Sequence, residues 1–204
     1  DFSTARSSIG PLSSVSKAIQ KVSFPKLTGL SSMTIHDRTI NLWNKSLLLN
    51  VIIAIPFTML LPLLIPLLYG KEFQNAIVPA IVLVLFSIID GQTMIFRNAV
   101  NGSGKTFVNT TTEIISAFFI IITLLLTVNF WGVIGASIIT VISALLKVSI
   151  YLYEYNKSIH KLTIRHLIPS ISDLKFIVFS TNRMVKNVLG LMRVNLNKKG
   201  NKTI

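Results

Sequence analysis

The sequence predicts an all-α protein built as a polytopic bundle of transmembrane helices, and three observations support this fold class. Hydrophobic residues make up 51% of the chain and charged residues 13%, whereas soluble domains carry about 25% charged residues. Long apolar runs alternate with short polar connectors. The excess positive charge of +13 lies between and after those runs, which indicates membrane topology rather than nucleic-acid binding.

The run from Leu47 to Tyr69 contains no charged residue. As a helix it reaches roughly 35 Å, enough to cross a hydrocarbon core of about 30 Å. Pro56, Pro62 and Pro66 each remove an amide donor, so we expect the helix to bend against protein neighbours. Gly70 then begins a tight turn, after which the chain returns into the membrane.

Three further spans are predicted, over residues 75–100, 107–128 and 132–154. The last of them carries small residues at every fourth position, which favours a face where helix backbones approach closely. The alternative is that Gly and Ala are simply frequent in membrane helices. The residues of this small-residue face are Gly132, Ala136, Thr140 and Ala144.

The segments before the first clear span are more polar. Residues 9–30 have helical spacing of apolar side chains among many serines, and two interpretations stay open: a cavity-lining helix of the bundle, or an amphipathic helix on the surface. Residues 31–45 are predicted to form a polar connector in water. His36 beside Asp37 is therefore interpreted as a solvated side chain without a catalytic role.

Two regions are predicted overall: a transmembrane bundle over residues 1–155 and a basic cytoplasmic tail over residues 156–204. Between Leu174 and Met192 the apolar residues fall on one helical face, typical of an interfacial amphipathic helix. A disordered basic tail is the competing interpretation.

Lys and Arg gather in alternate connectors, with Lys147 counted as part of the tail. By the positive-inside rule, residues 31–45, 97–105 and the tail are cytoplasmic, whereas Lys71-Glu72 and residues 129–131 face outward. Aromatic residues are then predicted to form belts at both membrane surfaces. The outer belt comprises Tyr69, Phe73, Phe130 and Trp131, and the inner one Tyr151, Tyr153 and Tyr155.

No pattern of residues predicts an enzyme. The stretch Asn101 to Thr106 ends like a phosphate-binding P-loop, but Ala99 stands where the first glycine belongs, and a helix precedes it instead of a strand. We interpret it as a turn between helices. We expect no catalytic residues, no nucleotide, no cofactor and no metal site, and the absence of cysteine excludes thiol chemistry.

Asp90 and Arg97 are charges within a predicted span and lie seven residues apart, so they face the same way about 10 Å apart along the helix. Facing lipid would cost Asp90 about 2.5 to 3.5 kcal/mol on insertion scales, so we expect both to face the bundle interior.

Four stretches carry a resemblance to a known family: AIQKVSFPKL (18–27), YGKEFQNA (69–76), NGSGKT (101–106) and WGVIGASIITVIS (131–143). In this order they resemble the C-terminal half of a bacterial polysaccharide flippase of the multidrug, oligosaccharidyl-lipid and polysaccharide exporter superfamily. The resemblance implies one half of a pseudosymmetric transporter, in which residues 9–30 form a cavity-lining helix before four clear spans. The chain begins with Asp1, and we expect it to be a piece of a longer protein whose N-terminal half is missing.

By this resemblance the chain would export a lipid-linked oligosaccharide across the bacterial inner membrane by alternating access, with membrane lipids and the missing half as its other partners. Arg97 could then contact the carrier diphosphate, because guanidinium matches phosphate oxygens, or it could merely anchor its helix. Two other functions stay open: a relative that exports drugs, and a membrane-embedded glycan polymerase or ligase. The candidate substrate contacts are Asp90, Arg97, Asn98, Asn101 and Lys105.

Overall fold

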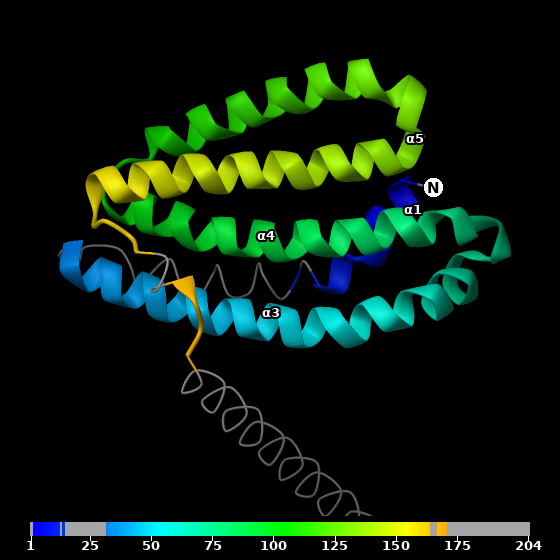
Figure 1. Ribbon diagram of the computed structural model, residues 1–204, viewed down its shortest axis with the longest axis horizontal. Helices are drawn as coiled ribbons and strands as arrows, with labels where there is room; N and C mark the ends of the chain where they lie inside the picture. Colours follow the sequence, from blue (N-terminus) through cyan, green and yellow to red (C-terminus); the bar gives the residue numbers. More distant parts are fainter. Residues whose placement is uncertain (1, 13, 15–31, 164–166, 171–204) are drawn as a thin grey trace, which may run out of the picture. The chain divides into compact units, whose positions relative to one another are not determined.

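The computed structural model describes residues 2–12, 14, 32–163 and 167–170, and within them all regular structure is helical, which confirms the all-α fold class (Figure 1). Residues up to Ile168 form one compact unit, and a second unit begins at Pro169. The predicted interfacial helix after Leu174 lies outside the described residues. The elements are α1 (Phe2–Ser8), α3 (Ser32–Tyr69), the 3-10 helix η2 (Lys71–Ala76), α4 (Ile77–Gly102) and α5 (Phe107–Ser158).

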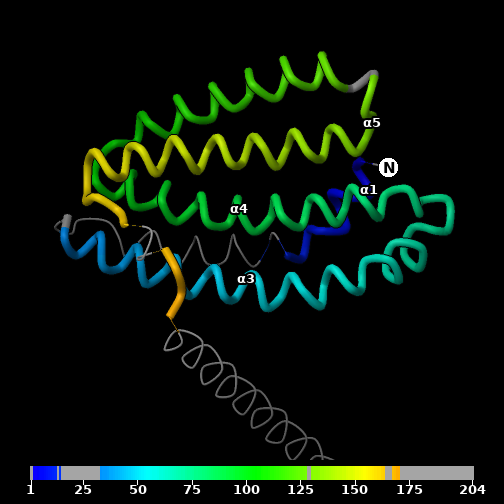
Figure 2. Tube along the Cα trace, viewed as in Figure 1, coloured from blue at the N-terminus to red at the C-terminus, as the bar shows by residue number. Residues whose placement is uncertain are grey.

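Four helical segments of the described chain are long and apolar enough to cross a membrane, as the sequence predicts. Two of them are the arms of α5, a first arm (Phe107–Thr127) and a second arm (Phe130–Ser158). The chain reverses near the start of the second arm at Gly132, whose φ of 51° and ψ of −134° are far from helical values. Figure 2 shows the trace folding back there, with α4 lying between α3 and the second arm of α5.

The turn after α3 is confirmed at Gly70, which has a φ of 97°. The three prolines remain inside one continuous α3, and Figure 1 shows that helix curving toward its C-terminal end. Pro56 and Pro62 are exposed, whereas Leu61 and Ile65 are fully buried. The helix therefore turns Leu61 and Ile65 toward the bundle, and the rings of Pro56 and Pro62 away from it.

The predicted polar connector over residues 31–45 is wrong, because α3 already begins at Ser32. Its 38 residues would span about 57 Å, which exceeds the hydrocarbon thickness and leaves room for charged side chains at the first turns. Ile35 and Thr39, one turn apart, are buried. His36 is also buried, at 8% exposure, with its Nδ1 2.9 Å from the hydroxyl of Tyr155, so the predicted solvated histidine is wrong too.

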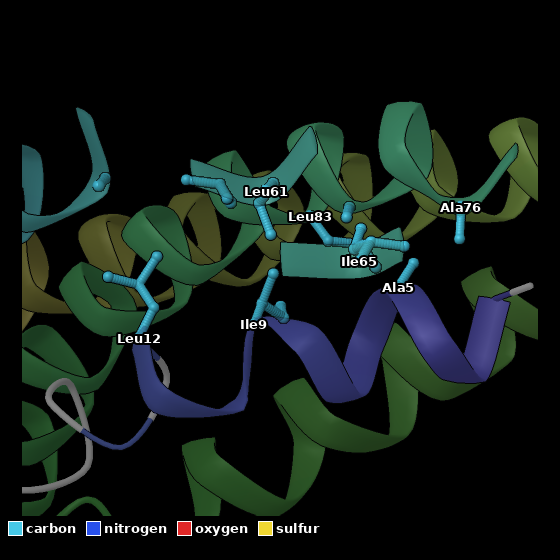
Figure 3. Packing of buried hydrophobic residues seen from close by; sticks show 10 residues of the cluster. Ala5, Ile9, Leu12, Leu61, Ile65, Ala76 and Leu83 are labelled. Carbon is cyan, nitrogen blue, oxygen red and sulfur yellow. The ribbon is translucent and has the colours of Figure 1, made fainter. Parts of the chain in front are cut away.

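The N-terminal residues pack into the bundle near the Gly70 turn. Ala5, Ile9 and Leu12 are buried and contact α3 and α4 side chains such as Leu61 and Leu83 (Figure 3). For residues 2–12 this favours a place within the bundle over a surface helix. Most of the predicted helix over 9–30 lies outside the described residues.

A second core lies at the opposite end of the bundle, near the turn between α4 and α5, and it includes two of the three tyrosines predicted for an inner aromatic belt. Tyr151 and Tyr155 are fully buried, whereas Tyr153 is 67% exposed. The belt prediction is wrong for the two buried residues because each hydroxyl has a partner inside the bundle: Asn109 Oδ1 for Tyr151 at 2.8 Å, and His36 for Tyr155. The remaining members of this core are Ile35, Phe96, Ala99 and Val100.

We predict that the Gly70 turn and the α4–α5 turn lie on opposite sides of the membrane. Both Glu72 and Thr106 are exposed, and the native chain has no cysteine that would interfere with labelling. A membrane-impermeant maleimide should modify Glu72→Cys in intact cells and Thr106→Cys only after permeabilisation. Labelling of Thr106→Cys in intact cells, with protection of Glu72→Cys, would reverse the orientation.

A candidate ligand groove between α1, α4 and α5

A cavity of about 500 Å³ opens between α1, α4 and the two arms of α5. The small-residue face of the second arm borders it along its length. Ala144 is buried, at 1% exposure, but a Cβ added at Gly132 would meet nothing within 4 Å. The small residues therefore share a face, as predicted, and that face is packed at Ala144 but borders open space at Gly132. Lining residues are Phe2, Arg6, Phe86, Ile120, Leu124, Gly132, Val133, Ala136, Ile139, Thr140, Ser143, Ala144 and Lys147.

Among the described residues that line the groove, the two charged ones are both cationic: Arg6 from α1 and Lys147 from the second arm of α5. Lys147 lies about 16 Å before the end of its helix at Ser158. Counting its charge with the cytoplasmic tail is therefore wrong, whereas the predicted span over residues 132–154 already includes it: Lys147 is a half-buried cation inside a membrane-length helix. Most other side chains of the wall are hydrocarbon, so the groove is amphipathic.

Lys147 is held by a carboxylate on the facing arm of α5. Its Nζ lies 2.7 Å from Oε2 of Glu113, whose Oε1 is 3.4 Å from Nη1 of Arg97 on α4. One carboxylate thus serves two cations, and we call Arg97, Glu113 and Lys147 the charge triad. At neutral pH its net charge is positive. All three side chains are partly exposed, at 28%, 44% and 21% respectively.

Two flanking hydrogen bonds fix the position of the triad. Tyr151 donates to Asn109 Oδ1 at 2.8 Å, and the hydroxyls of Ser116 and Ser143 are 2.7 Å apart. Along the antiparallel arms these contacts lie one turn to either side of the contact between Glu113 and Lys147. The three contacts follow one register, so the ion pair is positioned by the packing of the arms.

The structure places only Arg97 of the five predicted substrate contacts in the charge triad. Asp90 is half-buried on α4, and Asn98 is buried at 3% exposure. In the part of the chain that is described, no hydrogen-bond donor reaches the buried Oδ1 of Asn101. None of the five predicted contacts, Arg97 and Lys105 included, is among the residues that line the groove.

Lys105 belongs to the turn that follows α4. Its Nζ contacts Oε1 of Glu154 at 2.5 Å and Oγ of Ser158 at 2.6 Å. Gly104 has a φ of 89°, which confirms the interpretation of this stretch as a turn between helices. Lys105 therefore joins the turn to the end of α5, and its partners Glu154 and Ser158 are not residues of the groove wall.

Sequence reasoning missed Arg6, Glu113 and Lys147 as site residues. The signal was present for two of them, because Glu113 and Lys147 interrupt apolar runs just as Asp90 and Arg97 do. Their pairing could not be read from the sequence, since it depends on the register between the arms of α5. Among the described residues, no three histidines or carboxylates come together in a way that could hold a metal ion.

The fold and the groove define a multi-pass helical membrane protein. Comparison of the chain with protein-family models, curated proteins and solved structures finds no match.

Proposed function

We propose that this chain forms part of a bacterial inner-membrane transporter that moves a lipid-linked oligosaccharide across the bilayer for cell-surface polysaccharide synthesis. The observation that carries this proposal is the amphipathic groove, with its hydrocarbon wall and the cations Arg6 and Lys147. A lipid-linked sugar has matching chemistry: a prenyl chain suited to the apolar wall, and a diphosphate suited to ammonium and guanidinium groups.

Charge at membrane depth supports a transport role. Placing a cation within an apolar helix is costly, and such residues in membrane proteins mark substrate or ion pathways. The charge triad carries a net positive charge next to an open groove, so a neutralising anion would be favoured there. A groove for cationic drugs would instead need acidic lining residues, and within the part of the wall that the structure describes the charged side chains are Arg6 and Lys147.

A second helical body is part of the proposal. Lipid would penalise the partly exposed charges of the triad unless protein or water covers them. Alternating access also requires two bodies that rock around a shared site. We propose that the other half of the same transporter supplies this body and closes the groove.

Arg97→Gln, introduced at the native locus of the bacterium that encodes the chain, tests the proposal. We expect surface polysaccharide to fall about tenfold or more, since hydrogen bonds to charged groups contribute about 1.5 to 3 kcal/mol. Lectin or antibody staining of intact cells measures the polysaccharide, and immunoblotting of membranes checks that the variant protein accumulates.

Lys105→Gln is the matched control, because it removes one positive charge that pairs with Glu154 and not with the charge triad. It should leave polysaccharide close to the wild-type level. Unchanged polysaccharide in a well-expressed Arg97→Gln strain would contradict the proposed function and leave Arg97 as an anchor of its helix.

A further inference from the structure

We infer that Glu113 is a built-in counter-ion that an anionic lipid displaces from Lys147, and that Arg97 holds the carboxylate once it is displaced. The ligand class is a single apolar chain ending in a phosphate or diphosphate. This inference deepens the proposed function and rests on it for its biological meaning, but the binding step is tested separately.

The shape and charge of the groove select this ligand class. From Gly132 to Lys147 the second arm of α5 extends about 22 Å along the groove, and the wall between them is apolar or small. The cation Lys147 stands at one end of this path. An elongated chain with its anionic group at one end would place hydrocarbon against Ile139 and Leu124 and phosphate oxygens at the Lys147 ammonium.

The ammonium is already occupied in the structure. Glu113 Oε2 lies 2.7 Å from Lys147 Nζ, a normal length for a charge-assisted hydrogen bond. The ammonium keeps two further N–H donors, but a phosphate that binds them would stand beside the Glu113 carboxylate, and repulsion between the two anions favours weakening of this contact. The Glu113 side chain is 44% exposed, so its carboxylate has room to move.

The second cation of the triad, Arg97, explains how the Glu113 carboxylate can be displaced from Lys147 without being left unpaired. An unpaired carboxylate in a low-dielectric region is strongly disfavoured. Arg97 Nη1 is 3.4 Å from the other carboxylate oxygen, a longer distance than that of the Lys147 contact. This distance can shorten once Glu113 no longer contacts Lys147. Each charged group of the triad then keeps a partner in both states: Lys147 exchanges Glu113 for phosphate, and Glu113 keeps Arg97.

The experiment measures binding to the full 204-residue chain in phosphatidylcholine nanodiscs by isothermal titration calorimetry. The probes are geranylgeranyl diphosphate, the uncharged alcohol geranylgeraniol, and inorganic diphosphate. We expect Glu113→Gln to tighten geranylgeranyl diphosphate binding about tenfold by removing the competing anion, and Lys147→Gln to weaken it about tenfold. Geranylgeraniol affinity should be the same in both variants, and inorganic diphosphate alone should bind weakly because it lacks the apolar chain.

Glu72→Gln is the matched control, since it removes one carboxylate from the exposed helix η2 and should leave affinity unchanged. Glu113→Asp covers the case in which the glutamine variant fails to fold: the shorter side chain weakens the Lys147 contact and should also tighten binding, by a smaller factor. Unchanged or weaker binding in both Glu113 variants, or equal tightening in Glu72→Gln, would overturn the inference. A failed proposed function would instead show as normal surface polysaccharide in the Arg97→Gln strain, whatever the binding results.

Discussion

Phe96→Ala is expected to lower the free energy of unfolding by about 3 to 5 kcal/mol, the range measured when a buried phenylalanine is truncated in a packed core. The side chain of Phe96 is fully buried. Its ring centroid is 4.7 Å from that of Trp43 on α3 and 5.3 Å from that of Tyr155 on α5. One ring from α4 thus contacts both neighbouring helices, and its loss leaves a void that three helix backbones would have to move to fill.

The polar contacts around this aromatic cluster make such movement costly. Trp43 donates through its Nε1 to the carbonyl of Leu167 at 3.0 Å, and the Tyr155 hydroxyl is held by His36. Closing the void would stretch both hydrogen bonds, so we expect the cavity to persist and the free energy of unfolding to fall by the full amount expected for an unfilled cavity.

Unfolding of the purified protein in mixed micelles, followed by circular dichroism against an increasing fraction of SDS, measures this effect. Phe118→Ala provides the control, because that side chain is 62% exposed on the first arm of α5 and its removal creates no internal void. A loss of stability in Phe118→Ala as large as in Phe96→Ala would contradict the assigned role of the cluster.

The membrane-spanning helices could be predicted because their signal is local. An uncharged run such as Leu47 to Tyr69 is long enough by itself to require a helix that crosses the hydrocarbon, and glycines 70 and 104 mark turns through their backbone freedom. The start of α3 could not be predicted this way. His36 and Asp37 look like loop residues until the distant Tyr155 is known to bury the imidazole.

The site was less predictable, because the charged residues that contact one another in it come from different helical segments. The charge of Lys147 was counted with the basic tail, although the residue falls within the predicted span over 132–154, because charge and sequence position were the only guides. Its role follows from the antiparallel register that places Glu113 opposite it and from the small residues that leave the groove open. Arg97 was recognised from its charge within a span, but its partner lies on another helix.

Gly132 sets that register, and Gly132→Ala is expected to destabilise the bundle by about 1 to 3 kcal/mol, because residues with side chains are strained at such backbone angles. Its φ of 51° and ψ of −134° direct the second arm of α5 back along the first. The added methyl group would meet no atom within 4 Å, so the penalty comes from the backbone alone. Gly10→Ala, at a helical position where the methyl group also meets nothing, should be neutral or stabilising. The same SDS titration compares the two variants, and equal stability would show that the reversal at Gly132 does not depend on glycine.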